Sequence, residues 1–189
     1  FLRGEIEKKI YSRKIQMLKK IPDALKKALE QENNIQLMAK EFLSARGSMF
    51  LGRGTSFPVA LEGALKLKEL SYLHAEGYPA GEMKHGPLAL IEEGLPVIVV
   101  APKDKYFEKA LSNMQEVIAR GGKIFFLTDN KKNLISENIR FGLRVPYLDE
   151  SLSAILLTVP LQLLAYHVAL LKNCDIDKPR NLAKSVTVE

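Results

Sequence analysis

Short, fully apolar runs alternate with amphipathic runs in the middle of the chain, and this alternation limits the possible folds more than any other feature. The run LPVIVVAP is followed by KYFEKALSNMQEVIARGG, whose apolar residues recur at helical spacing, and then by the apolar run KIFFLTD. Strands that are apolar on both faces are typical of parallel sheets covered by helices on both sides. The sequence therefore predicts an α/β fold, a three-layer αβα sandwich with a parallel sheet.

Further elements extend this pattern in both directions. The run SMFLGRG predicts a strand and a Gly-Arg-Gly turn, and TSFPVALEGALKLKELSYL predicts a helix with Thr55 or Ser56 as its N-cap. IRFGLRVPY predicts another strand. Because apolar residues recur at near-helical spacing before the sheet, we expect two helices there, over residues 2–18 and 22–45.

The chain divides into three expected parts. Residues 1–46 are expected to form a helical lead-in from a preceding domain, residues 47–175 the α/β domain, and residues 176–189 a C-terminal tail. The last helix of the domain, SAILLTVPLQLLAYHVALLKN, is nearly long enough to span a bilayer. Pro160 and His167 interrupt its apolar surface, so we expect a buried core helix and no membrane association.

Charge and cysteine content narrow the functional classes. The formal net charge is +6, but the lysines of the lead-in are interleaved with glutamates and apolar residues, as is typical of a solvated helix face. The sequence lacks the aromatic and basic alternation of a single-strand nucleic-acid surface. The only cysteine, Cys174, can form no internal disulfide, and no Cys/His cluster predicts a metal site. The single cysteine and the lack of a leader after Phe1 predict a cytoplasmic protein, and the start at Phe1 in place of a methionine predicts a fragment of a longer one.

One helical stretch, LEGALKLKEL, carries residues suited to proton transfer. Glu62, Lys66 and Glu69 are four and then three positions apart, so all three project from one face of the helix. A carboxylate beside a lysine can act as a base that moves a proton between adjacent carbons. The same spacing is typical of a surface ion-pair ladder, and the pattern alone leaves both interpretations open.

The three histidines have different predicted environments. His85 directly precedes a Gly-Pro pair, which favours a turn and an exposed imidazole facing a site, although a loop histidine bonded to backbone fits equally well. Gly77 and Pro79 predict a loop before it. His74 is expected at a helix end, where the helix dipole explains it. His167 is expected to be a satisfied core residue.

Three blocks, EGALKLKE, KHGPLALI and PRNLAKSVTVE, occur in this order. Together they resemble the C-terminal sugar-isomerase (SIS) half of the glucosamine-6-phosphate synthase family, the isomerizing glutamine–fructose-6-phosphate aminotransferases. The resemblance covers nearly the whole chain and is strongest from Phe50 onward. It implies the SIS fold and identifies the helical lead-in as the connection from a preceding SIS domain.

The resemblance also implies roles for four residues. Glu69 would move a proton between the first two carbons of the sugar, and Glu62 and Lys66 would support it from the same helix face. His85 would open the fructose ring. In the family this histidine reaches the site from the neighbouring subunit, so the resemblance implies a homodimer.

The tail carries the remaining implied site residues. Lys184 would form a Schiff base with open-chain fructose 6-phosphate, and Ala183 beside it would contact the substrate. The family reaction converts fructose 6-phosphate and glutamine to glucosamine 6-phosphate and glutamate, the entry step to UDP-N-acetylglucosamine. The resemblance implies neither a metal nor an organic cofactor.

Two parts of the family pattern do not occur in this chain. One is a glutaminase domain with an N-terminal cysteine, which Cys174 does not match, and the other is a first SIS domain with a Ser-x-Ser-x-x-Thr phosphate loop. The GRGTS turn is the equivalent of that loop and departs from it. We therefore expect both domains upstream, and little activity from this chain alone.

Two other functions stay open at this point. A stand-alone SIS module could bind a phosphosugar as a regulator or act as a simple ketose/aldose isomerase, and borohydride trapping of a sugar on Lys184 would favour the aminotransferase over it. The hypothesis of a basic nucleic-acid-binding protein is supported only by the net charge of the chain. Salt-dependent DNA binding would support it, and we expect none.

Overall fold

The computed structural model describes residues 3–131 and 138–182. In this part of the chain a five-stranded sheet has the order β2-β1-β3-β4-β5, and every neighbouring pair is parallel. The strands are β1 (Gly47–Gly52), β2 (His74–Pro79), β3 (Pro96–Val100), β4 (Lys123–Thr128) and β5 (Ile139–Arg144). The α-helices are α1 (Lys8–Lys19), α2 (Ile21–Leu29), α3 (Glu32–Lys40), α4 (Ser56–Ser71), α5 (Phe107–Ile118) and α6 (Ser153–Leu171). The predicted parallel α/β sheet is confirmed.

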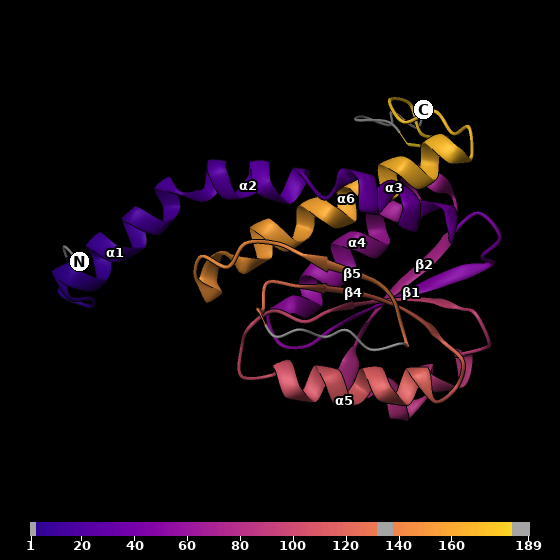
Figure 1. The fold of residues 1–189 in the computed structure, drawn as a ribbon, viewed down its shortest axis with the longest axis horizontal. Coiled ribbons are helices and arrows are strands. Elements are labelled where there is room, and N and C mark those ends of the chain that lie inside the picture. Colours follow the sequence, from indigo (N-terminus) through magenta and orange to yellow (C-terminus); the bar gives the residue numbers. More distant parts are fainter. Residues whose placement is uncertain (1–2, 132–137, 183–189) are drawn as a thin grey trace, which may run out of the picture.

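Helices cover both faces of the sheet, as Figure 1 shows. The α5 side of the sheet buries Leu51 and Val99 in one apolar cluster. The opposite side, which faces α4, α6 and α3, buries Phe50 and Ile98 in a second cluster. Neighbouring residues on β1 and β3 thus point to opposite faces, and both faces are dry. The three-layer αβα arrangement follows directly from strands that lack a polar face.

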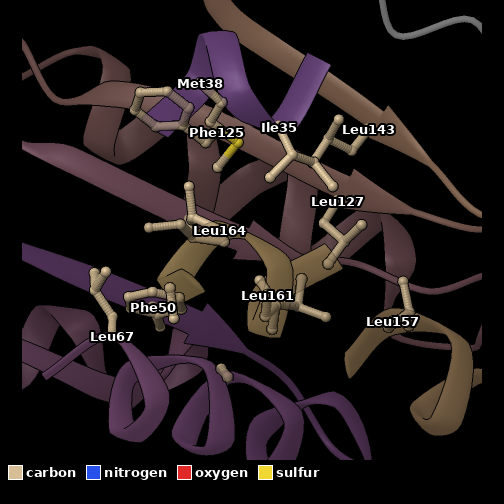
Figure 2. Packing of buried hydrophobic residues seen from close by; sticks show 14 of the residues in the cluster. Ile35, Met38, Phe50, Leu67, Phe125, Leu127, Leu143, Leu157, Leu161 and Leu164 are labelled. Atoms are coloured by element: carbon tan, nitrogen blue, oxygen red, sulfur yellow. The ribbon is translucent and has the colours of Figure 1, made fainter. Parts of the chain in front are cut away.

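Helix α6 lies in the core between α4 and α3, and Figure 2 shows its leucines among the side chains of the sheet. A Cβ atom on Gly63 of α4 would lie 2.8 Å from Leu161 Cδ1 and 2.9 Å from Phe50 Cδ1, so only glycine permits this close packing. By length and composition, α6 is the one helix in the described residues that could cross a membrane, but half of its most apolar window is buried in the protein. It is the buried core helix that the sequence predicts.

The sequence predicted a loop where the structure has strand β2, and that prediction was wrong. β2 pairs only with β1 and lies at the edge of the sheet, where Pro79 at its end removes no essential ladder hydrogen bond. Gly77 within it is needed because a Cβ atom there would lie 2.9 Å from Leu61 Cδ2. His74 likewise begins β2 and does not end the preceding helix, with its Nε2 atom 3.4 Å from Glu76 Oε1.

The lead-in contains three helices in place of the two expected. The predicted helix over residues 22–45 is interrupted after α2 and resumes as α3, because the chain turns there to lay both helices on the core. Ala24 and Ala28 of α2 and Ile35 of α3 are buried in the cluster that also contains the α6 leucines. Helix α1 buries none of its residues and extends away from the sheet (Figure 1). The division at residue 46 stays a prediction.

Candidate functional site

Helix α4 holds the three predicted acid–base residues on one side and the core on the other. Its buried residues recur at helical spacing, which turns Glu62, Lys66 and Glu69 outward together. Lys66 Nζ donates a hydrogen bond to Glu69 Oε2 at 2.7 Å. Both side chains are only 30% exposed, so this pair is more shielded from water than a typical surface ion pair.

The electrostatics of this face keep Lys66 protonated. The hydrogen bond to Glu69 raises the pKa of Lys66, with smaller contributions from the negative charges of Glu69 and Glu62, although partial burial acts in the opposite direction. Gln162 of α6 reaches Glu62, with its Nε2 atom 3.5 Å from Glu62 Oε1. A positively charged lysine therefore lies between two carboxylates, an arrangement that suits a base whose orientation must be fixed.

His85 lies apart from this face in the described part of the chain. It ends a short 3-10 helix, Ala80–His85, and the following Gly86 has a φ of 144°, which turns the chain sharply. The imidazole is 76% exposed, as the Gly-Pro pair predicted. Its Nε2 atom is 3.8 Å from Glu82 Oε2, and no hydrogen bond or ion pair joins it to the α4 carboxylates among the described residues.

The predicted tail residues Ala183 and Lys184 lie outside the described residues. The described tail reaches Leu182, and just before it the backbone amide of Arg180 donates to Tyr72 Oη at 2.8 Å. Sequence reasoning did not single out Tyr72. No pattern in the sequence points to it, since its left-handed backbone at the end of α4, where glycine is usual, is visible only in the structure.

The GRGTS turn at the carboxyl end of β1 is closed by its own hydrogen bonds. Ser56 Oγ accepts from the Arg53 amide at 2.8 Å and donates to the Arg53 carbonyl at 2.9 Å. Thr55 is the N-cap residue of α4 but makes no side-chain capping bond. Because Ser56 Oγ already bonds within the turn, the turn offers less to a phosphate than a loop with free hydroxyls.

Cavities lined by described residues lie beside the sheet. One of about 210 Å³ lies at the carboxyl ends of the strands and is lined by Thr55, Glu150 and Ser153 among others. Another, of about 240 Å³, lies at the opposite ends of the strands beside His74 and Glu92. A larger one, of about 480 Å³, lies against α1 and is lined by Lys14 and Asp149 among others. The described residues contain no group of three or more His, Cys, Asp or Glu side chains placed to hold a metal ion. None of these cavities includes the acid–base face of α4.

His167 has the buried environment that the sequence predicts. It lies within α6 and its side chain is only 8% exposed. Its Nε2 atom is buried 3.2 Å from Glu32 Oε1 of α3 but has no hydrogen-bond partner among the described residues, so the expectation that this histidine is satisfied was wrong. This contact joins α3 to α6 and gives His167 a structural explanation.

Comparisons with known proteins agree with the predicted resemblance. The glutamine–fructose-6-phosphate aminotransferase (isomerizing) of Bartonella quintana is 50% identical over 188 residues, which cover 99% of this chain and 31% of that protein. The protein of the same name from Salmonella typhi is 52% identical over 172 residues, which cover 91% of this chain and 28% of that protein. The chain thus spans about a third of the length of the curated relatives it matches.

The structural comparison places the match at one end of such proteins. The C-terminal domain of glucosamine–fructose-6-phosphate aminotransferase from Francisella tularensis has a TM-score of 0.89 and 40% identity, over 94% of this chain and 50% of that one. The alignment is therefore to the C-terminal isomerase part of these relatives. A family model for the SIS domain matches residues 41–172, so the chain belongs to the SIS domain family.

Proposed function

We propose that this chain forms the C-terminal isomerase part of a glutamine–fructose-6-phosphate aminotransferase, which converts fructose 6-phosphate and glutamine to glucosamine 6-phosphate and glutamate. The observation that carries the proposal is the partly shielded pair on α4, with Lys66 Nζ 2.7 Å from Glu69 Oε2. The names of relatives that are 50% identical over nearly the whole chain support the same reaction.

Each site residue has a chemical role under this proposal. The Lys184 amine would condense with the carbonyl at C2 of the open-chain sugar and release water, forming an imine. Ammonia released from glutamine would then replace the Lys184 nitrogen at C2 and free the lysine amine, and Glu69 would take a proton from C1 and return it to C2, with Lys66 and Glu62 holding its orientation. His85 would exchange protons with the sugar ring as it opens, and Ala183 would contact the substrate.

The proposal includes partners. We infer a homodimer in which His85 serves the neighbouring subunit, since its exposed imidazole makes no described contact with the α4 carboxylates of its own chain. A glutaminase domain and a first SIS domain would precede this chain, because it matches only 31% of its relatives' length. A cytoplasmic location and a role in UDP-N-acetylglucosamine synthesis belong to the same proposal.

Two measurements test it. The full-length protein, incubated with fructose 6-phosphate and glutamine, should produce glucosamine 6-phosphate, and borohydride should trap the sugar on Lys184, as peptide mass spectrometry would detect. Absence of both product and adduct would refute the proposal and favour a stand-alone phosphosugar-binding module.

Mixing two inactive variants tests the shared site. If His85 acts across the interface, a mixture of His85→Ala and Glu69→Gln subunits forms hybrid dimers with one intact site, and activity returns to about a quarter of wild type. If His85 acts within its own chain, the mixture stays inactive.

A further inference from the structure

The beginning of the C-terminal tail folds back onto the end of α4. The Arg180 amide donates to Tyr72 Oη at 2.8 Å, and the Arg180 guanidinium carbon lies 4.0 Å from the centroid of the Tyr72 ring. Closer to α6, Cys174 Sγ lies 3.9 Å from the Ser71 carbonyl oxygen. The chain after α6 therefore meets Ser71, the last residue of α4, and Tyr72 directly after it through two separate contacts, one of which combines a hydrogen bond with a cation–π contact.

Tyr72 adopts an unusual backbone conformation to make this contact. Its φ of 59° and ψ of 13° are left-handed, and its amide donates to the Lys68 carbonyl at 3.1 Å, which closes the helix. Glycine normally occupies this position because any Cβ atom makes the conformation costly. A tyrosine here needs a reason beyond ending the helix, and the contact of its side chain with Arg180 supplies one.

The contact between Tyr72 and Arg180, called the anchor below, connects the end of the helix that carries Glu69 with the segment that leads to Lys184. Tyr72 follows Glu69 by three residues, which is about 4.5 Å along a helix axis. Lys184 follows Arg180 by four residues, so the Cα atoms of these two residues are at most about 14 Å apart. Fixing Arg180 on Tyr72 would thus limit how far Lys184 can extend from the helix end that carries the proposed base.

We propose that Tyr72 is a positioning residue, which holds the root of the tail through Arg180 and thereby keeps Lys184 within reach of the sugar that Glu69 serves. This inference rests on the proposed function for its chemistry and on described contacts for its geometry. Preorganisation of this kind reduces the conformational entropy that the tail loses when the imine forms.

Substitutions at Tyr72 separate positioning from helix capping. Tyr72→Phe keeps the ring over Arg180 but removes the hydroxyl oxygen that accepts the hydrogen bond from the Arg180 amide. Tyr72→Gly removes the whole side chain and relieves the left-handed conformation, so a residue with only a capping role would tolerate it or gain stability. Tyr166→Phe, at an exposed tyrosine on α6, is the matched control.

Hydrogen exchange on this chain tests the anchor without any substrate. The Arg180 amide should exchange about tenfold faster in Tyr72→Phe than in wild type, because its acceptor is lost. Tyr166→Phe should leave the rate unchanged. An unchanged exchange rate of the Arg180 amide in Tyr72→Phe would show that the Tyr72 hydroxyl does not hold the tail at Arg180.

Kinetics of the full-length aminotransferase test the positioning role. Tyr72→Gly should lower kcat and the rate of borohydride trapping on Lys184 by about tenfold or more, with an unchanged or higher unfolding midpoint, and Tyr72→Phe should fall between it and wild type. A wild-type rate of borohydride trapping in Tyr72→Gly would overturn the positioning role of Tyr72. A slower rate that is explained by a lower unfolding midpoint would overturn it as well. If wild type itself forms no adduct, the proposed function fails and the positioning role with it, while hydrogen exchange still decides the anchor.

Discussion

Helix α1 is tied to the domain by a carboxylate whose removal should have a measurable cost. Asp149, just after β5, accepts hydrogen bonds from Lys14 of α1 and from Ser151 Oγ, and its side chain is 8% exposed. Helix α1 buries none of its residues, so this charged contact takes the place of apolar packing. Asp149→Asn keeps the size of the side chain and removes the charge.

The size of the effect follows from the pKa of Asp149. The hydrogen bond from Lys14, followed by that from Ser151, lowers this pKa from 3.8 to about 2, which corresponds to about 2 kcal/mol of stability at neutral pH. Since the Lys14 side chain is 45% exposed, solvent screening reduces the expected value to about 1 kcal/mol. A carboxylate with a lowered pKa stabilises the folded state above its unfolded pKa and loses this contribution as the pH falls towards 2.

Urea unfolding at several pH values provides the assay. Asp149→Asn should unfold with about 1 kcal/mol less free energy than wild type at pH 7, and the difference should shrink by about half near pH 3. Lys14→Met should cause a similar loss at pH 7, because it removes the same ion pair. A difference between wild type and Asp149→Asn that is the same at pH 7 and pH 3 would refute the electrostatic explanation.

Three further predictions concern the helices of the site and the core. Glu69→Gln should lower kcat of the full-length protein by about 10²- to 10⁴-fold in a product assay, whereas Glu92→Gln, at an exposed loop residue, should not change it; equal activities would exclude Glu69 as the base. Lys66→Met should lower kcat more than it changes KM, since it frees the Glu69 side chain, and a change in KM alone would contradict this orienting role. Gly63→Ala should cost about 1 to 3 kcal/mol in urea unfolding through overpacking, and Gly142→Ala, whose Cβ would meet nothing within 4 Å, should cost less; equal costs would contradict the packing argument.

The apolar strands and amphipathic helices made most of the fold predictable. Strand β2 escaped prediction because it lies at the edge of the sheet, where His74 and Glu76 need no apolar partner layer and Gly77 serves close packing. The break between α2 and α3 was also missed, because both helices bury apolar residues at a spacing that continues across the turn.

The candidate site was predictable only where its residues are close together in the sequence. Helical spacing places Glu62, Lys66 and Glu69 on one face, and the structure confirms that they share it. The contact between Tyr72 and Arg180 joins residues 108 positions apart and depends on a left-handed backbone at Tyr72, so no periodic pattern reports it. The Gly-Pro pair predicted an exposed His85 but carries no information on what it faces.

The side of α4 that carries Glu62, Lys66 and Glu69 faces away from the core, and this has a practical consequence for ligand discovery. Leu61 and Leu65 beside it are exposed by 43% and 47%, and none of the cavities described above includes this face. Fragment screening against this chain alone should therefore return compounds that fill those cavities and miss those that compete with the sugar. Under the proposed function, a useful inhibitor screen needs the assembled protein, in which a second wall completes the site.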